Sequence, residues 1–372
     1  MNVTVEQPAP RSRKARIGTL LRKRVVSLII LELIFVAAVG AYNSDFLRFE
    51  NFKVIFDNMA LDAIAMVGTV FLLAAGRFDL SIDGVANLSG ILAGLSLTSW
   101  GMPTVVAVLI GLGTGLTVGL INGVLIERYD FNPLITTLGT WWATLGIALG
   151  VTQGYTPYNF PQSFNNIGQA TFGSLLIEVW YAVAIIAIGT VVLKFTRFGY
   201  HVYATGGDRD ASRLNGVRVV GIGILLYAVS GTLSGLVGTV FAARLASAPA
   251  TAFSGLALNV IAGAVIGGAS LSGGRGSVIG GLLGLLLLNM LDNAAIYVGI
   301  SPYWEQLISG SVLLIAVGAD VAATRREARA GEVGASRRGF GSIFGKPRAP
   351  AAEAFAGDGV LTQARDGEVP SS

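Results

Sequence analysis

The chain has 372 residues, of which 53% are hydrophobic and 13% charged, and its mean hydropathy is +0.66. Soluble domains carry about a quarter charged residues. No Asp, Glu, Lys or Arg occurs in 84–126 or in 131–177. Apolar stretches of that length are too long for the core helices of a soluble protein. The composition excludes a soluble enzyme and predicts an all-α, polytopic membrane helical bundle.

Cysteine and histidine usage excludes several kinds of chemistry. The chain has no Cys and a single His, His201, so a disulfide framework, a thiolate or His-based metal cluster and a Ser-His-Asp triad are all excluded. The net charge of +4 lies mostly in the two tails, which is more typical of membrane orientation than of nucleic-acid binding. We therefore expect no metal site, no catalytic residue and no nucleic-acid partner.

In chain order, apolar stretches of about 20 residues predict about ten membrane-spanning helices. They cover 25–42, 54–75, 84–100, 103–126, 133–151, 174–193, 219–243, 253–271, 276–296 and 302–319. The third is short and rich in glycine, so it either spans the membrane or re-enters it. The first can also be read as part of a cleaved signal peptide, but its long apolar run favours a retained helix.

Positively charged residues predict the orientation, because they concentrate on the cytoplasmic side. With ten spans and both termini cytoplasmic, 23 of the 26 Lys and Arg lie on that side. The chain then divides into a basic tail (1–24), a membrane domain (25–321) with a cytoplasmic loop at 194–218, and a second tail (322–372) that we expect to be disordered. The uncharged stretch 152–173 is expected to be a polar loop on the outside.

Fifty glycines predict how the helices pack. Helices in lipid associate through small residues that let their backbones approach closely. Pairs of small residues four positions apart recur in three spans, at Gly111, Gly115 and Gly119, at Gly231 and Gly235, and at Gly276, Gly280 and Gly284.

Polar residues within or beside the spans are candidates for a translocation pathway, because each is costly in lipid unless it faces protein or water. The candidates are Asp79, Ser81, Asn87, Asn122, Asn259, Ser270, Ser272 and Asn289. Amides suit a neutral, hydroxyl-rich cargo, although hydrogen bonds that stabilise the bundle explain them at least as well. An ion-coupled carrier would instead depend on acids within the spans, such as Asp62 or Asp292.

The sequence lacks a phosphate-binding G-x-x-x-x-G-K-[ST] loop, since Pro347 follows its one Gly-Lys pair. Active transport without ion coupling would therefore require a separate ATPase that acts on a cytoplasmic loop, and only 194–218 is long enough. In that loop Gly206-Gly207 predicts a flexible turn. Asp208 predicts the cap of a short helix that ends before Gly216. Such a helix is either a docking element or a plain amphipathic connector.

This loop resembles the pattern G-x-x-x-x-A-x-G-G-N-x-x-A-A-R-L-S-G of permeases in ATP-binding-cassette (ABC) importers of the ribose, xylose and arabinose type. The residues in register are Gly199, Ala204, Gly206, Gly207, Ala211, Arg213, Leu214 and Gly216, with Asp208 in place of Asn. Three more stretches are similar to family motifs: Gly76–Ile82 (family G-G-I-D-L-S-V), Asn122-Gly123 with 133–140, and 267–277 continuing to 299–304. The resemblance covers about 50–320.

The resemblance implies a permease of the bacterial inner membrane, surrounded by lipid and paired with a second copy. It would import a monosaccharide or related polyol, which an extracytoplasmic binding protein delivers. A separate cytoplasmic ATPase would bind the ATP, so the chain itself needs no cofactor. The nine loop residues from Gly199 to Gly216 would receive the movement of that ATPase.

Departures from the family pattern leave the substrate open. Arg77 and Asp83 stand where the pattern has glycine, and a local ion pair between them is one interpretation. Permeases for branched-chain amino acids or nucleosides share the architecture but match these motifs less well. The other alternative is a stand-alone facilitator or ion-coupled carrier of a small polar solute. An intramembrane enzyme is poorly supported, because the spans contain no nucleophile–base pair.

Overall fold

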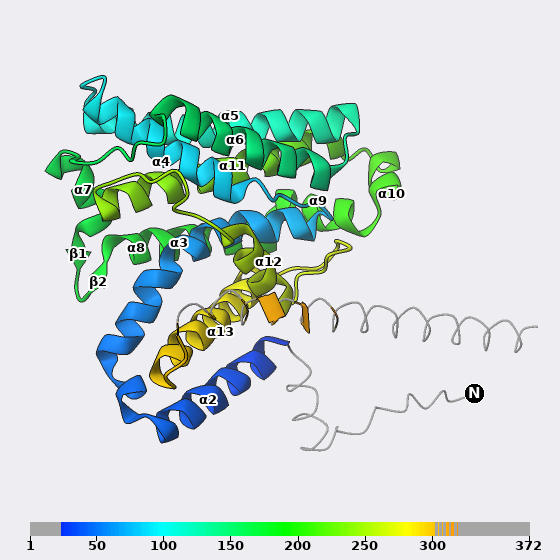
Figure 1. Ribbon diagram of the computed structural model, residues 1–372. Helices are drawn as coiled ribbons and strands as arrows, with labels where there is room; N and C mark the ends of the chain where they lie inside the picture. Colours follow the sequence, from blue (N-terminus) through cyan, green and yellow to red (C-terminus); the bar gives the residue numbers. More distant parts are fainter. Residues whose placement is uncertain are drawn as a thin grey trace, which may run out of the picture. The chain divides into compact units, whose positions relative to one another are not determined.

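The computed structural model describes residues 24–301 and the isolated positions 304, 307, 310, 311, 314, 315 and 318. Helices dominate this part of the chain (Figure 1). In order they are α2 (Arg24–Tyr42), the short 3-10 helix η1 (Ser44–Leu47), α3 (Phe49–Ala74), α4 (Ile82–Thr98), α5 (Thr104–Tyr129), α6 (Pro133–Thr152), α7 (Gln162–Gln169), α8 (Ile177–Phe195), α9 (Arg197–Gly207), α10 (Arg209–Leu214), α11 (Val219–Leu245), α12 (Leu256–Ile266) and α13 (Val278–Tyr297).

Within the described residues, seven helices are long and apolar enough to cross a membrane: α2, α3, α5, α6, α8, α11 and α13. α4 and α12 are shorter apolar helices. These nine correspond to the first nine predicted spans, so the prediction of a helical, polytopic membrane protein is confirmed. The tenth predicted span, 302–319, lies outside the described residues apart from the isolated positions, as do the tails 1–23 and 322–372.

The eighth predicted span differs most from its helix. The prediction covers 253–271, whereas α12 contains 11 residues. The chain leaves the helix at Gly267 and Gly268, where Gly268 has a φ of +103° that favours glycine. A loop then runs to Ser277, whose side chain accepts a hydrogen bond from Gly280 N and so begins α13. By contrast, the third predicted span forms a helix of 17 residues, α4.

α3 and α11 form the centre of the bundle. Most of their side chains are buried, whereas α2 and α6 expose many large apolar side chains, as helices that face lipid do. α11 lies against α3, α4 and α5 (Figure 1). Gly115 on α5 and Gly231 on α11 bring their backbones into contact, because a Cβ on either glycine would overlap the carbonyl oxygen of the other. The small-residue pattern therefore predicted this interface correctly.

The uncharged segment between α6 and α8 is more ordered than the expected polar loop. It contains α7 and a two-stranded antiparallel hairpin, β1 (Thr171–Phe172) with β2 (Leu175–Leu176). α7 packs on α11, where Gly168 lies against the backbone of Val240 and Arg244. This hairpin is a small departure from the all-α prediction in the described part of the chain.

Candidate functional site

The segment 194–218 forms two short helices rather than one. α9 begins after Thr196, whose side chain accepts a hydrogen bond from Gly199 N. α10 begins after Asp208, whose carboxylate accepts from Ala211 N at 2.9 Å, and the chain turns at Gly216 with a φ of +81°. The predicted cap and short helix are confirmed. The predicted turn at Gly206-Gly207 is wrong, because both glycines are the last residues of α9.

The end of α9 lies between the end of α3 and the glycine-rich loop that joins α12 to α13. A Cβ on Gly206 would overlap Ala74 O at the end of α3 and approach Gly274 N to 2.6 Å in the α12–α13 loop. Gly274 N in turn donates to Ala74 O at 2.9 Å. Tyr203 OH donates to Gly276 O at 2.7 Å, and burial raises the pKa of Tyr203 further above neutral pH. Three sequence motifs that lie far apart in the chain thus meet through their backbones.

The nine predicted coupling residues divide into two groups. Gly199 is buried, Gly206 is held by backbone, and Ala204 and Ala211 are half-buried. The residues Gly207, Asp208, Arg213, Leu214 and Gly216 are exposed, and Leu214 is 89% exposed. A Cβ on Gly207 would meet nothing within 4 Å. The second group therefore forms an accessible surface, whereas the first anchors it to the bundle.

A buried carboxylate joins α10 to the bundle. Glu127, near the end of α5, accepts hydrogen bonds from Arg77 Nε, from Arg77 Nη2 at 3.0 Å and from Arg209 Nη2 at 3.0 Å. The suggested ion pair between Arg77 and Asp83 is wrong, because Asp83 accepts from Gly255 N and Ala257 N instead. The sequence did not single out Glu127. It lies next to Arg128 at the end of a span, where charged residues commonly face the membrane surface.

Three predicted pathway residues belong to one buried hydrogen-bond network. Asp79 accepts from Ser81 Oγ at 2.6 Å and from Ser230 Oγ of α11 at 3.0 Å. Asn122 Nδ2 donates to Ser81 Oγ at 3.0 Å, and Asn122 Oδ1 accepts from Thr140 Oγ1 of α6 at 2.6 Å. The turn between α3 and α4 is thereby tied to α5, α6 and α11.

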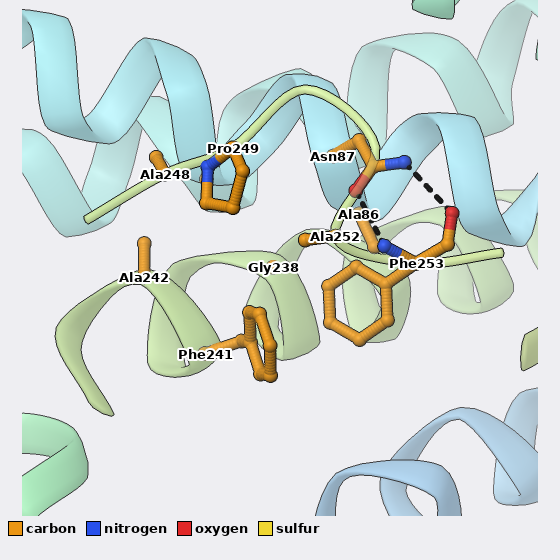
Figure 2. Close-up of a pocket in the computed structure, with 10 residues that line it drawn as sticks. Ala86, Asn87, Gly238, Phe241, Ala242, Ala248, Pro249, Ala252 and Phe253 are labelled. Atoms are coloured by element: carbon orange, nitrogen blue, oxygen red, sulfur yellow. Dashed lines mark hydrogen bonds between the residues drawn. The ribbon is translucent and has the colours of Figure 1, made fainter. Parts of the chain in front are cut away.

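Asn87 and Asp83 on α4 hold the segment before α12. Figure 2 shows that Asn87 forms two hydrogen bonds with the backbone of Phe253, accepting from its N at 2.9 Å and donating to its O at 3.1 Å. The hollow beside them has a volume of about 10 Å³, room for one water molecule. Asp83 caps the start of α12 through Gly255 N and Ala257 N. Both side chains thus position α12.

A larger cavity, of about 350 Å³, lies between α3, α12 and α13. Two predicted pathway residues, Asn259 and Asn289, line it. The other polar residues in its wall are Asn58, Asp62, Asp292 and Asn293, and the apolar ones are Val54, Ile55, Leu285, Leu288 and Ile296. Its volume falls in the range of small-molecule sites, and its polar groups offer both donors and acceptors for hydrogen bonds.

The remaining two predicted residues, Ser270 and Ser272, lie in the loop between α12 and α13. Ser272 N donates to Ser270 Oγ at 3.3 Å, and Ser270 N donates to Arg275 O at 3.0 Å. These bonds are local to the loop that contacts α9. Five of the eight predicted pathway residues, Asp79, Ser81, Asn87, Asn122 and Ser270, thus have side-chain hydrogen bonds that position turns or loops, and two others, Asn259 and Asn289, line the cavity.

The cavity and α9 lie at opposite ends of α3. Asn58 lines the cavity, while Ala74 contacts α9. At 1.5 Å per residue the two positions are about 24 Å apart along the helix, most of the thickness of a bilayer core, which is about 30 Å. The described residues contain no group of three or more His, Cys, Asp or Glu that could hold a metal ion.

Comparisons with known proteins give the family. Residues 55–317 match the family described as "Branched-chain amino acid transport system / permease component". The chain is 33% identical over 303 residues to the ribose import permease protein RbsC of Haemophilus influenzae. The aligned residues make up 80% of this chain and 92% of that protein.

Two arabinose permeases are similar as well. The L-arabinose transport system permease protein AraH of Escherichia coli is 32% identical over 78% of this chain and 88% of its own length. The L-arabinose ABC transporter permease protein AraH of Azospirillum brasilense is 30% identical, over 78% of this chain and 85% of its own length. No solved structure matches. The chain is a multi-pass protein of the bacterial cell membrane, and it belongs to the family of branched-chain amino acid transport system permease components.

Proposed function

We propose that the chain is the permease subunit of an ABC importer that carries a monosaccharide or related polyol inward. The observation that supports this best is the end of α9, fixed between the α3–α4 turn and the α12–α13 loop, next to an exposed α10. A force applied to such an element reaches both loops through rigid backbone contacts. The substrate class is inferred from the relatives, whose names describe them as ribose import and L-arabinose transport permeases.

The partners follow from this proposal. A separate cytoplasmic ATPase binds ATP and contacts Gly207, Asp208, Arg213, Leu214 and Gly216, so the permease itself is no enzyme and has no cofactor. An extracytoplasmic binding protein delivers the sugar on the other side. A second copy of this chain completes the pathway as a homodimer, lipid covers the exposed apolar helix faces, and nucleic acid takes no part.

The charge distribution supports the orientation. With both termini and 194–218 in the cytoplasm, α9 and α10 lie inside, and the cavity between α3, α12 and α13 opens toward the outside. The sugar then passes along Asn259 and Asn289, whose amides bind hydroxyl groups. Asp79, Ser81, Asn87, Asn122, Ser270 and Ser272 hold the surrounding helices and loops around that pathway.

The first test is purification of the tagged permease from its native membranes in mild detergent, with mass spectrometry of the proteins that accompany it. We expect an ABC ATPase, lost when residues 206–216 are scrambled. Arg213→Ala and Gly207→Leu are the sharper variants, because both positions are exposed and leave the fold intact. Both variants should assemble yet lose ATP-driven uptake, whereas Arg218→Ala, another exposed arginine of the segment, should retain it.

The alternative of an ion-coupled carrier has one observation in its favour, the two acids Asp62 and Asp292 in the cavity wall. Reconstitution in liposomes separates the two functions. Uptake that needs no ATPase and depends on a sodium or proton gradient would contradict the importer proposal. Uptake that requires ATP and the binding protein would exclude the carrier.

A further inference from the structure

The cluster of Arg77, Glu127 and Arg209 connects three parts of the molecule. Glu127 belongs to α5 and its side chain is 1% exposed. Arg77 lies in the α3–α4 turn and is also buried, with a 5% exposed side chain. Arg209 is the first residue of α10, and its side chain is 49% exposed. One carboxylate thus receives a cation from inside the bundle and a second from the accessible helix.

The two ion pairs differ in strength. Arg77 binds both oxygens of Glu127, and its Nη1 also donates to Ala75 O at 2.8 Å. A buried, bidentate pair of this kind is hard to break, because separation leaves an unpaired charge in a low dielectric. Arg209 makes a single bond of 3.0 Å, and its side chain is 49% exposed. When this bond breaks, the Arg209 guanidinium can return to water while Glu127 keeps its pair with Arg77.

Arg209 is not needed to compensate the buried charge. Arg77 and Glu127 already balance each other, since one is a cation and the other an anion. Arg209, the second cation, therefore contributes little to stabilising the buried Glu127 carboxylate. What it adds is a connection between α10 and the carboxylate.

From Arg77 the connections continue into the bundle. The next two residues of the same turn contact α11, where Phe78 O accepts from Tyr227 OH at 2.8 Å and Asp79 accepts from Ser230 Oγ. Ser81 then links to Asn122 on α5, as described above. Short polar contacts therefore run from α10 through Glu127 and the α3–α4 turn to the centre of the bundle.

We propose that Glu127 is the joint that passes movement of α10 to the α3–α4 turn, with Arg209 as its releasable positioning residue. This inference rests on the proposed function, in which an ATPase moves α10. When α10 moves with Arg209 attached, Glu127 pulls on Arg77 and thus on the turn. When the half-exposed bond breaks, α10 returns without moving the helices.

The test uses the whole importer, permease with its ATPase and binding protein, in proteoliposomes. The measured quantity is ATP hydrolysed per sugar transported, with the melting temperature of the complex recorded beside it. Arg209→Ala should raise this ratio about threefold or more without changing the melting temperature. Arg209→Lys should restore most of the coupling, because it keeps the charge. Arg218→Ala is the matched control and should leave the ratio unchanged.

A double-mutant cycle shows whether Arg209 acts through Glu127. In a Glu127→Gln background, Arg209→Ala should have no further effect on the ratio. Additive effects, or an unchanged ratio in Arg209→Ala alone, would overturn the inference. If Glu127→Gln does not fold, hydrogen exchange of the 75–81 amides decides the question. ATP should alter that exchange in the wild type but not in Arg209→Ala, and an equal response in both would overturn the inference.

The outcomes also separate this inference from the proposed function. A wild-type complex that transports without ATP overturns both. A wild-type complex that couples ATP to uptake, together with a normally coupled Arg209→Ala, overturns the joint alone.

Discussion

Two interfaces of the same bundle show opposite ways of packing helices. Between α5 and α11 the backbones touch, with Gly111, Gly115 and Gly119 facing the backbone or small side chains of α11. Between α3, α12 and α13, amide and carboxylate side chains line a cavity of about 350 Å³. Glycine closes one interface completely, whereas polar side chains keep the other open. The closed interface suits a rigid frame, and the open one suits passage of a solute.

The pair α12 and α13 combines both kinds of packing. Toward the α9 end, Gly267 and Gly280 bring the two backbones together, and Gly284 lies against Gly263. Toward the other end, Asn259 and Asn289 face the cavity. The two helices are therefore in backbone contact near Gly267 and separated by the cavity at Asn259 and Asn289.

The largest effect is expected from Gly115→Leu, which places a side chain where Gly231 O now lies. Overpacking against side chains costs about 1–3 kcal/mol, and here the obstacle is backbone that cannot give way. We expect no monodisperse permease by size-exclusion chromatography. Gly113→Leu, on the same helix with nothing within 4 Å, is the matched control and should purify normally. Equal behaviour of the two variants would contradict the rigid-frame interpretation.

A smaller loss is expected from Asn87→Ala, which removes both hydrogen bonds to Phe253 (Figure 2). Leaving a buried backbone group unpaired costs about 1–3 kcal/mol. The variant should fold with a lower melting temperature in detergent. Thr98→Ala is the control, since its hydroxyl bonds Gly94 O within its own helix. An unchanged melting temperature in Asn87→Ala would show that α12 is positioned by other contacts.

Filling the cavity should impair transport rather than folding. Asn289 Nδ2 bonds Leu285 O on its own helix, so Asn289→Leu breaks no contact between helices. We expect sugar uptake to fall about tenfold, equivalent to 1.4 kcal/mol of barrier, with unchanged yield and melting temperature. Leu286→Met, on the same helix but outside the cavity wall, should transport normally. Normal uptake by Asn289→Leu would place the pathway elsewhere.

The smallest effect concerns selectivity. Asp62 and Asp292 place two carboxyl groups in the cavity wall, and an ionised carboxylate there repels an anionic solute. Sugar acids should therefore compete poorly for uptake in the wild type and better in the Asp62→Asn, Asp292→Asn double variant. Competition by gluconate against the labelled neutral sugar measures this. Glu50 is an exposed acid outside the cavity, so Glu50→Gln is the control and should behave like the wild type. Equal competition by gluconate in the wild type, the double variant and Glu50→Gln would contradict the expectation.

Much of the fold could be predicted from the sequence, because apolar length and small-residue spacing are local signals. The cap at Asp208 was predictable for the same reason. Gly206 was misread, since a glycine in a turn and a glycine in a close contact look alike in sequence. α12 was predicted too long, because apolar residues continue past the point where the chain leaves the helix.

The candidate site was harder to predict, because a polar residue in a span reads the same whether it faces a pathway or a neighbouring helix. Asn122 and Asn289 are both amides in apolar helices, yet one is bound within a network and the other lines the cavity. Glu127 could not be recognised, since its two arginines lie 50 and 82 positions away. Only the folded chain brings them together.

The exposed end of α10 has a practical consequence for work with the isolated permease. The bond between Arg213 and Leu214 lies in a short helix at the surface, and both side chains are exposed. Trypsin cleaves after arginine, exposed loop tips are preferred sites of proteolytic nicking, and this bond lies at the end of α10, beside the turn at Gly216. Arg209 and Arg218 are exposed in the same segment. Trypsin digestion within 209–218 therefore offers a footprinting assay: the free permease should be cut in this segment, and a bound ATPase should slow the cut.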